Sequence, residues 1–354
     1  MIKYGHGGDI ETAKAYYSGE ILDFSANINP LGMPEGVARA ARESIRDTVH
    51  YPDPHCRRLR QAIAEKEGVE ARNILCGNGA ADLIFRLALA LKPKRAVVLA
   101  PTFSEYESAL RAAGCDVQYH RLRRENHFDV TDALLDQLTP DIDLLWLCTP
   151  NNPSGRLIEE TIMDRILEHC RRSGIFIAVD ECFLDLCTQG KPLTGRIRSF
   201  PRLFLLRAFT KSFAMPGLRL GYGLCGDSEL LERMAASGPP WAVSVPALAA
   251  GLAALLEDKF LERSRAYIAE ERQWLTGALR KLGFWVCEGA ANYLLLHSDQ
   301  PQDLGDAAQA RGILIRRCGN YVGLDEHDYR VAVRRREENQ RLIQVLAECL
   351  EEKP

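Results

Sequence analysis

The sequence predicts an α/β fold, with a mainly parallel sheet in a large domain and a smaller α+β domain at the C-terminal side. Its 354 residues are enough for about two domains with a sizeable core. Between about residues 70 and 225, short apolar runs alternate with longer amphipathic segments. The apolar runs lack an inside–outside alternation, which is typical of strands buried on both faces of a parallel sheet.

Four apolar runs, each bounded by polar or turn residues, are the expected central strands, and they cover residues 96–99, 144–148, 175–179 and 203–206. Helical spacing is found between them, at 105–113 and 159–172. Gly114 and Gly174 follow these two segments, where helix C-caps belong. Strand and helix in alternation place helices on both faces of the sheet. Ligands then bind at the carboxyl ends of the strands.

The smaller domain is expected after a long helix over residues 246–282. Short strands are predicted at 292–297, 313–316 and 329–333, and a charged helix at 336–352 closes the chain. The first 30 residues have no clear period. We therefore expect an N-terminal arm (1–30), a large ligand-binding domain (31–245), and a linking helix with the small domain (246–354).

Composition excludes several classes of function. The chain has 45 Lys and Arg against 48 Asp and Glu, so no basic face for nucleic acid is indicated. No apolar run approaches the about 20 residues that span a bilayer, and no secretory signal is evident. Eleven cysteines occur, but no two are separated by only two residues, so no zinc or thioredoxin-type motif is present. We expect a cytoplasmic protein with free thiols and no metal.

Two glycine clusters could bind phosphate. Gly77–Asp82 follows an apolar run and begins a helix, where free amides favour an anion, although such turns are often glycine-rich for steric reasons alone. Gly221–Gly226 fits the dinucleotide pattern G-x-G-x-x-G. That pattern needs a turn between strand and helix, whereas these glycines lie inside an apolar run. Dinucleotide binding is the weaker alternative.

Polar residues follow the other central strands. Thr149–Gly155 is a loop with two adjacent amide side chains, and Asp180 follows five apolar residues, where a carboxylate needs a cationic partner. Lys211 lies between Phe209 and Phe213, so its amine is a candidate for a depressed pKa and nucleophilic chemistry. We expect these groups to meet at one edge of the sheet.

In this order, Asn151–Gly155, Asp180–Phe183 and Thr210–Lys211 with the trailing Gly217–Tyr222 resemble motifs of the aminotransferase-fold pyridoxal phosphate enzymes, known as fold type I. The resemblance is collinear over essentially the whole chain. It implies pyridoxal 5'-phosphate as the cofactor of a class I/II enzyme.

The resemblance also implies individual roles. Lys211 would hold the cofactor aldehyde as a Schiff base and later shuttle a proton. Asp180 would keep the pyridine nitrogen protonated, which makes the ring an electron sink. Asn152 would donate to the phenolic oxygen, Phe103 would stack on the ring, and Phe183 replaces a tyrosine that many relatives place near that oxygen.

For the cofactor phosphate, the resemblance implies a site made by Gly79, Ala80, Ala81, Thr210 and Arg219. Tyr51 would reach the cofactor phosphate of a partner subunit, so a homodimer is implied.

Within this superfamily, His6–Gly8, Asp23–Gly32 and Ile315–Leu324 are similar to segments of the threonine phosphate decarboxylases. These enzymes convert L-threonine O-3-phosphate to (R)-1-amino-2-propanol O-2-phosphate for cobalamin biosynthesis. The resemblance implies that Arg330 meets the substrate carboxylate and that Arg316 and His6 meet its phosphate. Gly7 and Asn27 complete the expected substrate site.

Two alternatives stay open at this point. Histidinol phosphate aminotransferases share all the cofactor positions and would transfer the amino group to 2-oxoglutarate. A catalytically inactive binding module is the second, although Lys211 and Asp180 are both present. The sequence does not decide between decarboxylation and transamination, because that choice depends on which bond to the α-carbon stands perpendicular to the ring.

Overall fold

A seven-stranded sheet forms the centre of the large domain in the computed structural model, which describes residues 5–300 and 303–351. Its strands follow the order β2-β8-β7-β6-β5-β3-β4. They are β2 (Ile74–Gly77), β3 (Arg95–Ala100), β4 (Asp116–Arg121), β5 (Leu144–Cys148), β6 (Phe176–Asp180), β7 (Leu203–Ala208) and β8 (Gly221–Cys225). All neighbouring pairs are parallel except those that β8 makes with β2 and β7.

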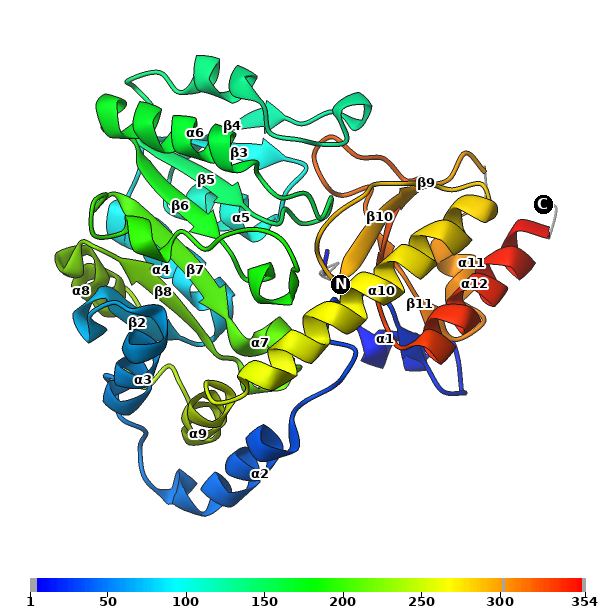
Figure 1. Cartoon of the computed structure of the whole chain (residues 1–354), viewed down its shortest axis with the longest axis horizontal. Coiled ribbons are helices and arrows are strands. Elements are labelled where there is room, and N and C mark those ends of the chain that lie inside the picture. The colour runs from blue at the N-terminus through cyan, green and yellow to red at the C-terminus, as the bar shows by residue number, and fades with distance from the viewer. Residues whose placement is uncertain (1–4, 301–302, 352–354) are drawn as a thin grey trace.

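Both faces of this sheet are buried, which explains the uninterrupted apolar runs. Val97 and Leu145 lie in one hydrophobic cluster, and their chain neighbours Val98 and Trp146 lie in another on the opposite face. Residues of α3, α6 and α9 contribute to the first cluster, and residues of α4, α5 and α8 to the second. The predicted α/β architecture is confirmed (Figure 1).

The helices of this domain are α2 (Glu35–Glu43), α3 (Arg57–Glu67), α4 (Gly79–Leu91), α5 (Glu105–Ala112), α6 (Glu160–Ser173), α7 (Phe209–Ser212), α8 (Ser228–Ala236) and α9 (Val245–Ala254). Short 3-10 turns connect them: η1 (Ser44–Val49), η2 (Ala71–Asn73), η3 (Arg124–Asn126), η4 (Asp132–Gln137), η5 (Leu184–Leu186), η6 (Thr194–Arg196) and η7 (Pro216–Leu218).

The single helix expected over residues 246–282 is wrong. The chain instead forms α9 and a separate α10 (Asp258–Lys281). At the break, the Leu255 carbonyl accepts a hydrogen bond from Lys66 Nζ at 2.9 Å, and Lys66 also pairs with Asp258 at 2.5 Å. Because α9 packs against α2 and α3 while α10 runs across to the small domain, the two helices need different directions (Figure 1).

The small domain contains an antiparallel sheet of order β12-β13-β10-β9. Its strands are β9 (Trp285–Val286), β10 (Tyr293–His297), β12 (Arg316–Arg317) and β13 (Asp328–Ala332), and its helices are α11 (Leu304–Gln309) and α12 (Arg336–Glu351). The strand expected over 313–316 divides at Ile315, because β11 (Ile313–Leu314) pairs with β1 (Leu22–Asp23) rather than with this sheet. The prediction of one strand there is wrong.

The N-terminal segment connects the two domains. It contains α1 (Ile10–Lys14), whose first turn is capped by the Asp9 carboxylate, and then β1. Phe24 is buried in the small-domain core. Asn29 Nδ2 donates to the Ser212 carbonyl and to Ser264 Oγ, each at 2.8 Å. The expected boundaries at residues 30 and 245 stay a prediction, and β1 packs with the small domain.

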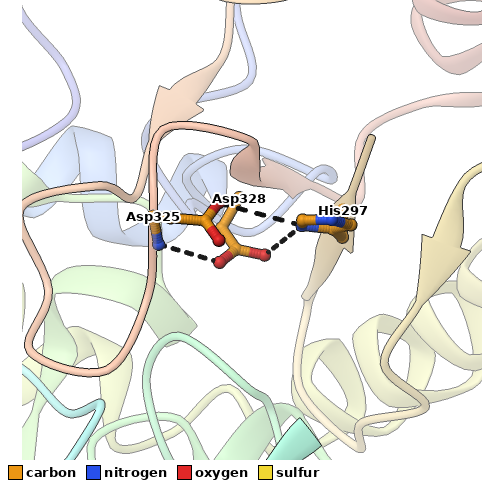
Figure 2. Close-up of side chains that lie close together, drawn as sticks. All are labelled: His297, Asp325 and Asp328. Atoms are coloured by element: carbon orange, nitrogen blue, oxygen red, sulfur yellow. Dashed lines mark hydrogen bonds and ion pairs between the residues drawn. The ribbon is translucent and has the colours of Figure 1, made fainter. Parts of the chain in front are cut away.

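An ion-pair network also joins the domains. His297 Nδ1 lies 3.0 Å from the buried Asp328 carboxylate, and Asp325 lies beside both, in an arrangement that could in principle hold a metal ion (Figure 2). However, Arg124 from η3 donates to the same Asp328 oxygen at 2.6 Å. The arginine already compensates the buried charge, so this cluster ties the large domain to β10 and β13.

All eleven cysteines are buried, and none of them forms a disulfide with another residue that the structure describes. Among the described helices, none has both the length and the apolar character to cross a bilayer.

Candidate active site

A cavity of about 360 Å³ lies at the carboxyl ends of β5, β6 and β7, between the large domain, the small domain and the N-terminal segment. Most residues that the sequence nominates line it: His6, Gly7, Asn27, Ala80, Ala81, Phe103, Asn152, Asp180, Phe183, Thr210, Lys211, Arg219, Arg316 and Arg330. Gly79 does not line the cavity itself but directly precedes Ala80 and Ala81 in the chain. Tyr51 is not part of it.

Lys211 belongs to the short α7, which directly follows β7 and therefore begins at the sheet edge. Its side chain faces the cavity and is otherwise enclosed by protein. Burial lowers the pKa of Lys211 to about 8, and the positive charges of Arg330 and Arg219 contribute in the same direction. The amine is therefore largely deprotonated in mildly alkaline solution, which is the state a nucleophile needs.

Asp180 is the last residue of β6, and its carboxylate is held from two sides. Oδ1 accepts the Cys182 amide at 2.8 Å, and Oδ2 accepts the Tyr106 hydroxyl at 2.7 Å. Burial raises the pKa of Asp180, while these hydrogen bonds lower it. The sequence did not point to Tyr106, although its place three residues after Phe103, on the first turn of α5, was a usable signal.

One end of the cavity is built for an anion. Helix α4 begins without a side-chain cap, so the amides of its first turn, including Ala80 and Ala81, are free to bind a ligand. Gly79 has φ +78°, and a Cβ atom there would lie 2.5 Å from Arg219 Nη2. The glycine thus lets the guanidinium approach these amides. This cradle fits a phosphate group.

The dinucleotide alternative is not supported by the local structure. Gly221 and Gly223 lie within β8, between β2 and β7, and not at a strand-to-helix turn. A Cβ atom at Gly221 would lie 2.9 Å from the Ala80 nitrogen, so this glycine is needed for close packing beside α4.

The other end of the cavity carries two buried arginines, Arg316 and Arg330, which lie directly opposite each other on β12 and β13. Arg330 donates to the Ser25 carbonyl at 2.7 Å and to Asn152 Oδ1, while its Nε has no hydrogen-bond partner among the described residues. Arg316 donates to Asn320 Oδ1 at 2.6 Å and to two backbone carbonyls.

These acceptors are all neutral. Within residues 5–300 and 303–351, neither Arg316 nor Arg330 forms an ion pair with a carboxylate. Buried charge without a counter-ion is costly, so this end of the cavity also favours anionic ligands. Asn27 Oδ1, another buried atom on the wall, likewise has no partner.

The N-terminal segment covers the cavity. His6 Nε2 lies 2.8 Å from Glu105 Oε1, and the His6 and Phe103 rings have centroids 5.6 Å apart. The Gly8 amide donates to Ser25 Oγ at 2.7 Å. Glu105, like Tyr106, was not singled out by the sequence.

Tyr51 lies outside the cavity of its own chain. It is 80% exposed, and its ring packs against that of Trp241 with centroids 4.7 Å apart. Ile45 and Val49, also exposed, precede it in the chain.

Comparison with known proteins agrees with this arrangement. The family described as "Aminotransferase class I and II" matches residues 19–346. The chain belongs to this family. Its members depend on pyridoxal phosphate, and the buried amine, the carboxylate and the anion cradle described above fit that cofactor.

One curated relative and one solved structure are both named as threonine phosphate decarboxylases. The chain is 40% identical to the threonine-phosphate decarboxylase of Salmonella typhimurium, over 99% of this chain and 98% of the relative. It also resembles the crystal structure of L-threonine-O-3-phosphate decarboxylase from Porphyromonas gingivalis, with a TM-score of 0.82, 26% identity, and coverage of 93% and 99% of the two chains. The histidinol-phosphate aminotransferase structure from Clostridium acetobutylicum has a TM-score of 0.87, 30% identity and the same coverage.

The pKa of Lys211 leads to a testable prediction. The rate at which the apo-protein captures pyridoxal phosphate should rise with pH and level off above about 8, because only the neutral amine attacks the aldehyde. Arg330→Gln should shift this midpoint upward, since it removes a positive charge that lowers the pKa of Lys211. Absorbance after rapid mixing measures the rate.

Borohydride reduction followed by peptide mapping should locate the cofactor on Lys211, and Lys211→Ala should capture none at this site. Finding the reduced cofactor on another lysine would overturn the assignment. Arg317→Gln is the control for the pH dependence of cofactor capture. Arg317 lies on the same strand as Arg316 but is paired with Asp303 and Asp306, so its substitution should leave the pH midpoint of the capture rate unchanged.

Proposed function

We propose that this protein decarboxylates L-threonine O-3-phosphate to (R)-1-amino-2-propanol O-2-phosphate, a step of cobalamin biosynthesis. The observation that carries the proposal is the buried pair Arg316 and Arg330, which faces the cavity without carboxylate partners in the described residues. The 40% identity to a threonine-phosphate decarboxylase over nearly the full length of both chains supports it.

Bound pyridoxal phosphate supplies an electron sink for the pair of electrons that is released when a bond to the substrate α-carbon breaks. The Lys211 amine would hold the cofactor, and it would also be the group that supplies the proton that the α-carbon takes up once carbon dioxide has left. Asp180, fixed by two hydrogen bonds, keeps the proton on the ring nitrogen. The amides of Ala80 and Ala81, together with Thr210 and Arg219, would hold the cofactor phosphate.

Three further residues orient the ring. Phe103 packs on one ring face, and Phe183 contributes apolar surface without a hydroxyl. The Oδ1 atom of Asn152 accepts a hydrogen bond from Arg330, so its Nδ2 is left to donate to the phenolic oxygen. The same side chain thereby links the substrate-binding arginine to the cofactor.

The substrate binds through its two anionic groups. Arg330 meets the carboxylate, and Arg316 with His6 meets the phosphate, while Gly7 and Asn27 close the site around it. A hydrogen bond to a charged group contributes about 1.5–3 kcal/mol, so each arginine accounts for roughly one to two decades of affinity. Carbon dioxide leaves as a neutral product, and one proton is taken up at the α-carbon.

Histidinol phosphate aminotransferase is the second candidate. The similarity to the Clostridium acetobutylicum structure favours it, because that chain matches with a TM-score of 0.87. An aminotransferase of this type also needs an arginine for the carboxylate of its second substrate. The arginines alone therefore do not separate the two activities.

Product analysis separates the two candidates. With threonine phosphate, the holoenzyme should release carbon dioxide and aminopropanol phosphate, and the cofactor should return to its starting spectrum. With histidinol phosphate and 2-oxoglutarate, turnover should be slow. Rapid formation of glutamate in that assay, without carbon dioxide from threonine phosphate, would move the assignment to the aminotransferase.

Substitution of the paired arginines tests the substrate site. Arg316→Gln and Arg330→Gln should each raise KM for threonine phosphate about 10- to 100-fold, because each removes a charge-assisted hydrogen bond. Arg317→Gln is the matched control on the same strand and should change KM less than twofold, since Arg317 does not line the cavity and pairs instead with Asp303 and Asp306. Equal effects in all three variants would contradict the assigned site.

We also propose that a second copy of the chain covers the exposed surface formed by Ile45, Val49, Tyr51 and Trp241, and that Tyr51 reaches the cofactor phosphate of the other subunit. These four apolar side chains are 46–80% exposed in the single chain. Such a patch on a soluble chain indicates an interface.

Hybrid dimers test this shared site. A Tyr51→Phe subunit combined with a Lys211→Ala subunit forms one site with both native residues. After subunit exchange in equal amounts, we expect the hybrids to contribute about a quarter of wild-type activity, because about half of the dimers are hybrids and each has one complete site, and this adds to the activity that the Tyr51→Phe homodimers retain. A fully active species that sediments as a monomer would rule out the shared site.

A further inference from the structure

We infer that Tyr106 is a positioning residue for the cofactor ring, because its hydroxyl fixes the Asp180 carboxylate and its ring edge supports Phe103. The inference rests on the proposed roles of Asp180 and Phe103. Neither the sequence motifs nor the comparisons with known proteins assign a role to this tyrosine.

The hydroxyl of Tyr106 controls the orientation of Asp180. It donates to Oδ2 at 2.7 Å, while the Cys182 amide donates to Oδ1 at 2.8 Å. Each carboxylate oxygen therefore has one fixed donor, and the plane of the group cannot rotate without breaking one of these bonds. Asp180 also lines the cavity, so its remaining acceptor capacity is available to a ring nitrogen there.

The tyrosine ring is itself held rigidly. Tyr106 is fully buried and stacks on Trp146, with centroids 4.9 Å apart and an interplanar angle of 16°. Its edge meets the Phe103 ring at 5.6 Å and 79°, a T-shaped contact. Trp146 lies on β5, two residues before Cys148, which is the register partner of Asp180 on β6. One side chain thus contacts two of the residues expected to touch the cofactor ring, Asp180 and Phe103.

Two side chains lower the pKa of the Asp180 carboxyl by hydrogen bonding, the Cys182 thiol and the Tyr106 hydroxyl, and the hydroxyl is the better donor because a thiol donates only weakly. Burial raises the pKa of Tyr106 itself, so the hydroxyl keeps its proton and donates to the carboxylate. The thiols of Cys148 and Cys182 also face Asp180, and burial raises the pKa of each, which keeps them neutral. Arg207, on β7, is the nearby cation that lowers the pKa of Asp180.

Arg207 is unable to replace the tyrosine. Its guanidinium forms ion pairs with Glu181 at 3.0 Å and with Asp185 at 3.1 Å, so two carboxylates already compensate its charge. Its effect on Asp180 is through space, whereas Tyr106 donates directly to the carboxylate. Loss of the hydroxyl should therefore favour the protonated form of Asp180, which cannot balance a protonated ring nitrogen.

Tyr106→Phe tests this role because it keeps the ring contacts and removes only the hydroxyl. We expect the affinity of the apo-protein for pyridoxal phosphate to fall about tenfold. The pH at which this affinity is half lost on the acid side should move up by about one pH unit. Both effects have the size expected for the loss of one hydrogen bond to a charged group. Quenching of tryptophan fluorescence at a series of pH values measures both, and the thermal unfolding midpoint checks the fold.

Tyr119→Phe is the matched control. This tyrosine also donates to a carboxylate, that of Glu107 at 2.5 Å, but neither residue lines the cavity. It should change neither the affinity for pyridoxal phosphate nor its pH dependence.

A double-mutant cycle separates positioning from packing. If Tyr106 acts through the charge of Asp180, Tyr106→Phe should have little further effect on cofactor affinity in an Asp180→Asn background. An equal loss in both backgrounds, or an unshifted pH midpoint, would overturn the inference and leave Tyr106 with a packing role only. The measurement uses no substrate, so its outcome is independent of whether the enzyme acts on threonine phosphate.

Discussion

Two buried arginines on neighbouring strands, both lining the cavity, are the constraint on which the site depends. Arg316 and Arg330 are direct partners in the β12–β13 register. Like charges placed opposite each other in a sheet destabilise it, and burial increases that cost. Backbone carbonyls and amide oxygens from distant segments offset part of this cost, and an anionic ligand in the cavity would offset the rest.

The acceptors that stabilise this pair also hold the molecule together. Arg330 donates to Ser25 of the N-terminal segment and to Asn152 of the large domain, although it belongs to the small domain. The same strand, β13, begins with Asp328, which pairs with Arg124 of the large domain. Substrate-binding groups and interdomain contacts therefore share one strand. Any shift of β13 relative to the large-domain sheet must change the geometry of the cavity.

The sequence predicts the large domain well because buried parallel strands leave a clear apolar signal. It also nominates most of the cavity wall, since polar residues after such strands have to meet at one sheet edge. It failed where tertiary contacts decide the local structure. Residues 246–282 have continuous helical propensity, and the break before Asp258 depends on Lys66, almost two hundred residues earlier. Tyr106 was missed because its place one helical turn after Phe103 was the single local signal, and a tyrosine there is equally typical of a core aromatic residue.

The spacing of the paired arginines bears on the choice of substrate. Residues directly opposite in an antiparallel pair have Cβ atoms about 4.5–5.5 Å apart. The side chains of Arg316 and Arg330 therefore leave the backbone close together on the cavity wall. A substrate that engages both must carry two anionic groups joined by a short chain. Threonine phosphate does so in one molecule, with its carboxylate and phosphate on adjacent carbons. Histidinol phosphate carries only the phosphate, and an aminotransferase would have to let a dicarboxylate take its place in the second half of the reaction. A site that keeps both arginines buried and free of carboxylates within the described chain therefore fits threonine phosphate in a single binding mode, whereas histidinol phosphate would leave one arginine without an anionic partner in its half of an aminotransferase cycle.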